Sequence, residues 1–142
     1  MERPALDHIG VAVNDLEAAL GAWAALGLAP ARVEEVAGER VRVALLPFAG
    51  GGRVELLEPL EGEGTVARFL ARRGPGLHHL ALAVADIRRA LREAEAAGLE
   101  PVDREPRRGA EGQWVAFLRP AGLGGVLVEL TQKETEPEEE EA

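Results

Sequence analysis

Hydrophobic and polar positions follow the same order twice along the chain. In the first half, "LDHIGVAV" (6–13) alternates between apolar and polar positions, which predicts a strand. Apolar residues then recur at helical spacing in "DLEAALGAWAAL" (15–26), which predicts a helix that begins after Asp15 and ends before Gly27. Three short extended runs follow this helix, so the first half predicts the element order βαβββ.

The second half repeats this order at an offset of 71 residues. "LHHLALAV" (77–84) predicts the strand, and "IRRALREAEAA" (87–97) predicts a helix between Asp86 and Gly98. The extended runs are "ARVEEV" (31–36), "RVRVALLPF" (40–48) and "RVELLEP" (53–59) in the first copy, then "PVDREP" (101–106), "QWVAFLRP" (113–120) and "GVLVELTQ" (125–132) in the second. Glycine-rich segments separate the last two runs of each copy and predict hairpin loops.

Neither copy is expected to bury a core alone, so we predict a single domain over residues 1–132. It consists of two modules, 4–59 and 75–132, and a linker, 60–74, with a short predicted helix at 65–73. The expected fold class is α+β: two tandem βαβββ modules whose half-sheets join into an open eight-stranded barrel. The acidic residues at the end predict a disordered tail over 133–142.

Composition narrows the range of partners. The formal charge of −9 over 142 residues falls to about −3 when the six glutamates after Lys133 are set aside, which argues against a nucleic-acid partner. The absence of cysteine excludes disulfides and thiolate sites. Apolar stretches fall short of the roughly 20 residues that span a membrane, and the first residues lack the pattern of a signal peptide. We therefore expect a cytoplasmic protein without a membrane partner.

Strand parity singles out one histidine in each module. His8 shares its face with Gly10 while Asp7 points the other way, and His79 is similarly opposed to His78. Taken alone, a histidine on a strand is more often a hydrogen-bonded core residue than a ligand.

The last strand of each module adds one glutamate to this pattern. Glu55 lies between Val54 and Leu56 and therefore on the opposite face, and Glu129 is placed in the same way. A single such glutamate is usually solvated, but a solvated glutamate has no reason to recur at the matched position. Two imidazoles and two carboxylates in one barrel form a plausible set of ligands for a divalent metal, with two octahedral positions open.

Several segments together carry a family resemblance. They are "LDHIGVAV", "VELLEPL", "GEGTVARFL", "GLHHLALAV", "EPRRGAEG" with "VAFLRP", and "GGVLVEL". With these segments the chain resembles the vicinal oxygen chelate superfamily and, within it, the methylmalonyl-CoA epimerases. The resemblance covers nearly all of residues 4–132.

The resemblance implies a homodimeric enzyme that interconverts (R)- and (S)-methylmalonyl-CoA, a CoA thioester. It implies one divalent ion per chain, with cobalt or manganese as the usual metal, held by His8, Glu55, His79 and Glu129. Glu129 matches a glutamate with a proposed role in proton transfer. The symmetry of the two modules then makes Glu55 the candidate for the opposite face of the substrate.

Two departures from the family pattern bear on the chemistry. Val43 stands where some members have a proposed acid/base glutamate, so that carboxylate is missing or has moved. "RPA" (119–121) stands where the family has a lysine near the substrate. Arginine-rich loops offer candidates for binding the phosphates of CoA: Arg72 and Arg73 in one loop, and Arg107 and Arg108 in the other.

Two alternatives remain open. Lactoylglutathione lyase, from the same superfamily, uses a similar set of two histidines and two glutamates and also moves a proton beside a carbonyl. Proteins of the same fold that sequester antibiotics bind small molecules without catalysis, and would have no need of paired His and Glu residues.

Overall fold

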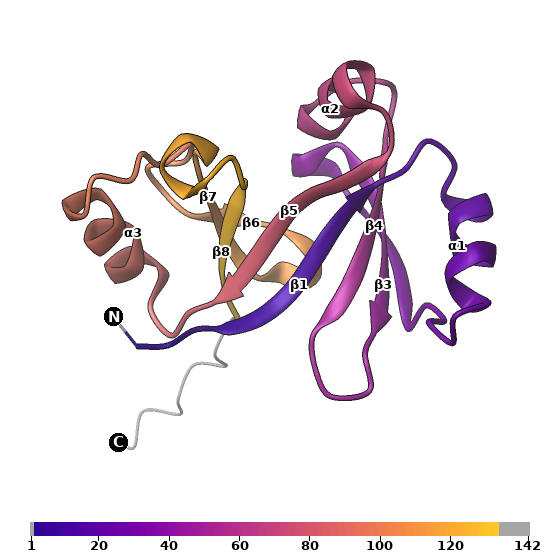
Figure 1. Cartoon of the computed structure of the whole chain (residues 1–142), viewed down its shortest axis with the longest axis horizontal. Helices are drawn as coiled ribbons and strands as arrows, with labels where there is room; N and C mark the ends of the chain where they lie inside the picture. The colour runs from indigo at the N-terminus through magenta and orange to yellow at the C-terminus, as the bar shows by residue number, and fades with distance from the viewer. Residues whose placement is uncertain (1, 134–142) are drawn as a thin grey trace, which may run out of the picture.

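Two long antiparallel strands, β1 (Ala5–Ala12) and β5 (Gly76–Ala83), run through the centre of the molecule (Figure 1). In this computed structural model, which describes residues 2–133, β1 pairs in parallel with β4 (Arg53–Pro59) and β5 pairs in parallel with β8 (Val128–Gln132). The eight strands form one sheet in the order β2-β3-β4-β1-β5-β8-β7-β6. The predicted tail lies, from residue 134 on, outside the described residues.

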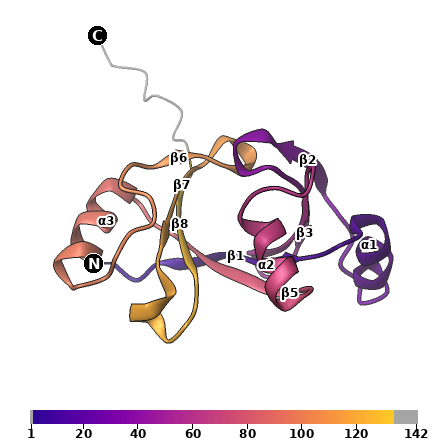
Figure 2. The same cartoon turned by 90° about the horizontal axis from the view of Figure 1, so that it is seen from above.

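The remaining elements complete two similar halves. They are α1 (Leu16–Ala24), β2 (Arg32–Val36), β3 (Val41–Pro47), α2 (Thr65–Arg73), α3 (Ile87–Ala96), β6 (Arg107–Arg108) and β7 (Trp114–Leu118), with 3-10 turns η1 (Ala37–Glu39), η2 (Ala110–Gly112) and η3 (Pro120–Leu123). Each half has the order βαβββ, and α2 lies between the halves. Figure 2 shows the outer strands of both halves turned toward the same side of β1 and β5, so the sheet is a curled half-barrel. The predicted α+β fold class is confirmed.

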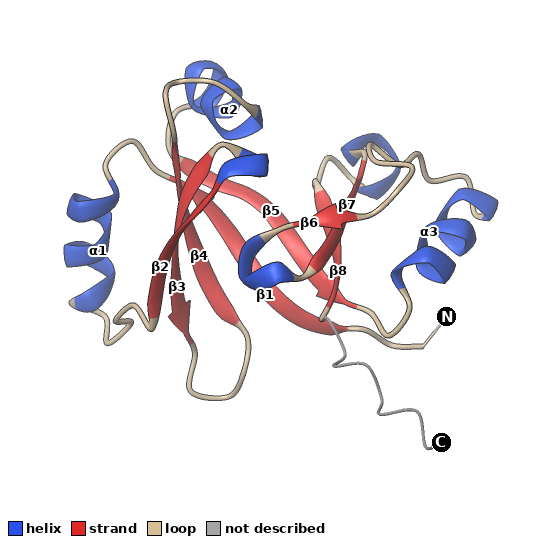
Figure 3. Cartoon of the chain, turned by 180° about the vertical axis from the view of Figure 1, so that it is seen from behind, coloured by secondary structure: helices blue, strands red, loops and turns tan. Residues whose placement is uncertain are grey.

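Helices α1 and α3 lie outside opposite ends of the sheet (Figure 3). Both begin at predicted caps, because Asp15 accepts a hydrogen bond from the Ala18 amide and Asp86 accepts one from the Arg89 amide. Such a cap stabilises a helix by about 1 kcal/mol. Each helix packs its apolar face against the outer face of its own half of the sheet, and the predicted ligands lie on the other, concave face. No helix within residues 2–133 is long and apolar enough to cross a membrane.

The prediction of a strand over 101–106 is wrong. Pro101 forms only an isolated bridge with Leu118, and the short strand β6 begins at Arg107. Pro101 and Pro106 lack the amide hydrogens that a strand ladder needs. The Asp103 carboxylate accepts a hydrogen bond from the Phe117 amide at 2.9 Å, so a side chain takes the place of a backbone acceptor.

Candidate metal and active site

The four predicted metal ligands come from the four central strands of the sheet. His8 is on β1, Glu55 on β4, His79 on β5 and Glu129 on β8, and all four side chains are buried along the same cavity. Gly10 is paired with His79 across β1 and β5, and a Cβ atom at this glycine would lie 2.2 Å from His79 Cε1. The glycine therefore makes room for the imidazole.

Three of the ligands form a tight group. The Nε2 atoms of His8 and His79 are 3.0 Å apart, and Glu129 Oε2 lies 3.2 Å from His8 Nε2. The other carboxylate oxygen of Glu129 is 4.0 Å from His79 Nε2. Glu129 Oε2 is buried and has no hydrogen bond. An acceptor in this state is costly unless a cation or another donor reaches it.

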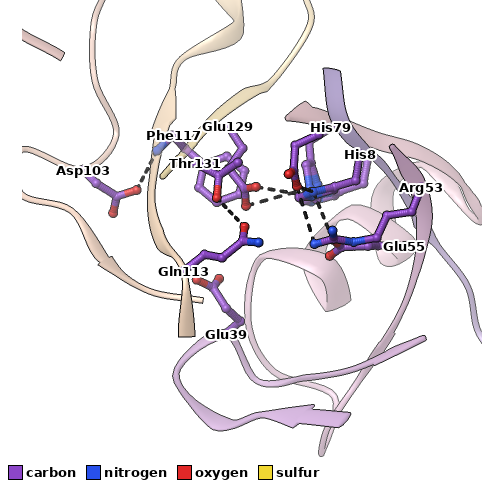
Figure 4. Close-up of polar contacts among 12 residues, drawn as sticks. His8, Glu39, Arg53, Glu55, His79, Asp103, Gln113, Phe117, Glu129 and Thr131 are labelled. Atoms are coloured by element: carbon purple, nitrogen blue, oxygen red, sulfur yellow. Dashed lines mark hydrogen bonds and ion pairs between the residues drawn. The ribbon is translucent and has the colours of Figure 1, made fainter. Parts of the chain in front are cut away.

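Glu55 belongs to a second group on the other side of His8 (Figure 4). Its Oε2 lies 3.0 Å from His8 Nδ1, and Asp7 Oδ2 lies 2.7 Å from the same nitrogen. Arg53 reaches Glu55 Oε2 with both Nε and Nη2, each at 2.9 Å. The structure therefore brings His8, His79 and Glu129 together directly, and connects Glu55 to them through His8.

The charges on the two histidines differ because their neighbours differ. Burial would lower the pKa of His8, but hydrogen bonds with Asp7 and Glu55 and the charges of Glu55 and Glu129 raise it to about 10. Burial lowers the pKa of His79 well below its usual value, and the charge of His8 adds to this effect. Burial also raises the pKa of Glu129 to about 8. Without a metal ion, the site thus carries one charged and one neutral imidazole.

The predicted orientations of Asp7 and His78 are wrong. The register of β1 against β5 shifts between Leu6 and His8, and again opposite His78, so each of these residues lies in a β-bulge. A bulge changes the direction in which the side chain of the extra residue points. Asp7 therefore contacts His8, and His78 Nδ1 lies 2.9 Å from His79 Nδ1. Burial lowers the pKa of His78 to about 4, so it is neutral at pH 7.

The other polar residues in and next to the cavity were not predicted. Thr131 donates a hydrogen bond of 2.6 Å to Oε1 of Gln113, and both residues are buried (Figure 4). Strand parity offers a signal for Thr131, which lies two residues after Glu129, and for Arg53, which lies two residues before Glu55. The sequence offers no such signal for Glu39 or Gln113. Glu39 is the last residue of the 3-10 turn η1 and Gln113 directly follows η2, and the side chains of such short turns do not alternate as those of a strand do.

The four predicted phosphate-binding arginines do not form one site. Arg107 contacts Glu39 at 3.0 Å and Asp103 at 3.3 Å, and Arg108 stacks 3.9 Å from the ring centroid of Trp114. Arg72 and Arg73 line a separate groove of about 690 Å³ between α2 and the loop after η3. His78 and His79 border both this groove and the metal-site cavity, so the two spaces adjoin.

Comparison with known proteins places the chain in a family. The Glyoxalase/Bleomycin resistance protein/Dioxygenase superfamily matches residues 7–117. The chain belongs to this superfamily. A superfamily relative, the uncharacterized protein YqjC of Bacillus subtilis (strain 168), is 39% identical over 128 residues, which cover 89% of this chain and 91% of that protein. The mitochondrial methylmalonyl-CoA epimerase of Homo sapiens is 33% identical over 129 residues, which cover 89% of this chain and 73% of that protein.

Solved structures of superfamily members agree with the observed fold. The methylmalonyl-CoA epimerase of Mycobacterium tuberculosis has a TM-score of 0.87 and 34% identity, covering 92% of this chain and 88% of that one. A methylmalonyl-CoA epimerase in complex with methylmalonyl-CoA and NH4+ also has a TM-score of 0.87, with 33% identity, covering 94% of this chain and 97% of that one.

Members of the superfamily typically bind a divalent metal ion, and the residues of this site fit one. The group has nitrogen and oxygen donors of the kinds that bind divalent ions of the first transition row. Two imidazole nitrogens face each other, and the buried oxygen of Glu129 lacks a hydrogen bond. An ion among His8, His79 and Glu129 would satisfy all three side chains.

Proposed function

We propose that the chain is a metal-dependent methylmalonyl-CoA epimerase, which interconverts the (R) and (S) forms of its substrate. The observation that carries the proposal is the buried group of His8, His79 and Glu129, in a chain that matches epimerases over about nine tenths of its length. The expected assembly is a homodimer, from the resemblance to these enzymes.

The proposed ligands of one divalent ion per chain are His8, Glu55, His79 and Glu129, and the expected ion is cobalt or manganese. The ion would supply Lewis-acid stabilisation of negative charge on the substrate oxygens. For Glu55 to join the other three ligands, its carboxylate has to turn from His8 Nδ1, where it lies at 3.0 Å. Asp7 can keep the hydrogen bond with this nitrogen, and such a bond orients a ligating imidazole.

The reaction requires removal of a proton from the carbon between the thioester carbonyl and the carboxylate of the substrate. The resulting enolate is planar, and return of a proton to its other face inverts the centre. We assign one proton transfer to Glu129, because its buried Oε2 has no hydrogen bond and borders the cavity. By the symmetry of the two modules, Glu55 is the first candidate for the opposite face.

The nucleotide end of CoA needs cationic partners at the edge of the site. Of the four candidate arginines, Arg72 and Arg73 are the best placed, since both are exposed and line the groove next to His78 and His79. Arg107 is held by two carboxylates, and Arg108 lies over Trp114. Guanidinium groups match the geometry of phosphate oxygens.

The decisive experiment follows the purified protein with (R)-methylmalonyl-CoA in D2O, with and without a chelator. We expect conversion to the (S) form with deuterium at the α-carbon, loss of activity on chelation, and recovery with Co²⁺ or Mn²⁺. The methylglyoxal–glutathione adduct serves as the competing substrate. Turnover of the adduct alone would identify a lactoylglutathione lyase, and binding of ligands without turnover of either would identify a non-catalytic binding protein.

A further inference from the structure

The group that serves the second face of the substrate is not at its expected place. Val43 occupies that position, is 2% exposed, and packs in an apolar cluster with Val41 and Leu57. A valine side chain cannot transfer a proton. A two-sided mechanism therefore needs a carboxyl group from elsewhere on the wall of the cavity.

Among the described residues, the carboxylates that line this cavity are Glu39, Glu55 and Glu129. Glu55 is poorly suited to proton transfer because its Oε2 already contacts Arg53 twice and His8 once. These partners hold the carboxylate in place and occupy the oxygen that would have to accept a proton. A metal ion bound by Glu55 would engage the same carboxylate.

Glu39, unlike Glu55, lies outside the strands of the sheet. It ends the turn η1, and Arg40, in the left-handed conformation with φ 56°, then directs the chain into β3. Glu39 Oε1 is buried and has no hydrogen bond, and it lies 3.0 Å from Nη2 of Arg107. The same Nη2 donates a hydrogen bond of 3.1 Å to the other carboxylate oxygen, Oε2, so only Oε1 is without a donor. Arg107 also contacts Asp103, so one guanidinium is shared between two carboxylates. Burial raises the pKa of Glu39, and Asp103 adds to this effect against the opposing charge of Arg107.

Glu39 and Glu129 reach the cavity from opposite halves of the molecule. Glu39 belongs to the first half, beside β2 and β3, whereas Glu129 lies on β8 of the second half. The curl of the sheet brings these two parts to face each other (Figure 2). Figure 4 shows Glu39 across from Glu129, with Gln113 between them. Both glutamates line the cavity, so a substrate bound there would meet Glu39 from the first half and Glu129 from the second.

We propose that Glu39 is the second catalytic acid/base, acting on the face of the substrate opposite Glu129. The inference rests on the proposed epimerase function. In one direction the ionised carboxylate takes the α-proton, and the electron pair of the broken C–H bond delocalises into the enolate. The other carboxyl group, protonated, then gives its proton to the opposite face and forms a new C–H bond. The reverse direction exchanges the two roles, and no oxidant or reductant is needed.

The test compares Glu39→Gln with Glu34→Gln. Glu34 is a suitable control because its side chain is 17% exposed, close to the 20% of Glu39. It binds the Glu111 amide but does not line the cavity. Each variant is incubated with (R)- and with (S)-methylmalonyl-CoA in D2O. Exchange of the α-proton is followed by NMR, and inversion by the chirality of the product.

For Glu39→Gln we expect inversion to fall by about 100-fold or more, the usual contribution of a general acid or base. One epimer should still exchange its α-proton with solvent through Glu129, while the other should not. Metal content and the thermal midpoint should match those of wild type. Glu34→Gln should retain full activity, and Glu39→Asp, which keeps the carboxyl group, should retain part of the inversion.

Several outcomes would overturn the inference. Inversion by Glu39→Gln within about threefold of wild type would show that the group is not used. Equal loss of inversion in Glu39→Asp and Glu39→Gln, with both exchanges lost, would show a structural role. If Glu55→Gln, and not Glu39→Gln, lost inversion while still exchanging the α-proton of one epimer, the second acid/base would be Glu55. Failure of the wild-type protein to epimerise methylmalonyl-CoA would refute the proposed function, and the role of Glu39 would fall with it.

Discussion

Replacing Gly10 by alanine tests the metal site without removing any ligand. The added methyl group would lie 2.2 Å from Cε1, 2.5 Å from Nδ1 and 2.8 Å from Nε2 of His79. Carbon atoms in contact normally lie about 3.5–4.0 Å apart, so one of the two groups has to move by roughly an ångström. The backbone is poorly able to do so, because β1 is hydrogen-bonded to β4 on one side and to β5 on the other.

The imidazole therefore has to give way, although its neighbours limit the movement. Its ring packs edge-on against His8, His78 and Phe117, at centroid distances of 5.1, 5.1 and 5.4 Å. Metal ligands tolerate errors of only about 0.2 Å. We expect Gly10→Ala to bind Co²⁺ about 10 to 100-fold more weakly, the range seen when the orientation of a ligand is disturbed.

Stability should change less than metal binding. Overpacking costs about 1–3 kcal/mol, and the lower entropy of the unfolded alanine chain offsets about 0.5–1 kcal/mol of this. The Kd for Co²⁺ is measured by competition with a chromogenic chelator, and stability by urea unfolding of the metal-free protein. Gly21→Ala is the matched control, since a Cβ there meets no heavy atom within 4 Å. A Kd for Gly10→Ala within twofold of wild type would refute the argument that His79 is a fixed ligand.

Three further predictions address separate parts of the site. His79→Ala should lower the bound metal from one ion per chain to near zero by elemental analysis; unchanged stoichiometry would remove His79 from the ligand set. Thr131→Val should lower the free energy of unfolding by about 1–3 kcal/mol, because Gln113 Oε1 loses its donor. Thr131→Ser keeps the donor and loses only a buried methyl group, so it should destabilise less; equal values for both would contradict this. Reversing the charges of Arg72 and Arg73 should raise KM for the CoA thioester about tenfold and spare a pantetheine thioester, with Arg88→Glu as control; an equal effect on both substrates would exclude phosphate binding.

The sequence predicts the elements well where side chains repeat with the period of the backbone. Both helices begin at the predicted aspartates, and Glu55 and Glu129 lie on the predicted faces of their strands. Parity fails at Asp7 and His78, because a β-bulge inserts one residue and breaks the alternation. The bulges arise from the pairing of β1 with β5, a contact between residues about 70 positions apart, and no local pattern records it.

The two bulges also help to explain why two similar modules hold histidines with different pKa values. Asp7 and His78 occupy matched positions, each just before a predicted ligand. The carboxylate of Asp7 holds a proton on His8, with a pKa of about 10, whereas neutral His78 gives no such support to His79. The symmetry of the fold therefore fixes where the imidazoles lie. Their charges differ because carboxylates around His8, Asp7 among them, raise its pKa, whereas burial lowers the pKa of His79.

The two glutamates, Glu55 and Glu129, also differ in the residue that lies beside them. Arg53 and Leu127 occupy matched positions, two residues before Glu55 and Glu129, and residues two apart on a strand share a face. Arg53 binds Oε2 of Glu55, but Leu127 has no polar group to offer, and Oε2 of Glu129 remains without a hydrogen bond. A single arginine thus fixes one of the two matched carboxylates, whereas Glu129 Oε2 lies 3.2 Å from Nε2 of His8 and has no arginine partner on its strand. Under the proposed epimerase function, the second face of the substrate is assigned to a carboxyl group from outside the repeat, Glu39, which lines the same cavity.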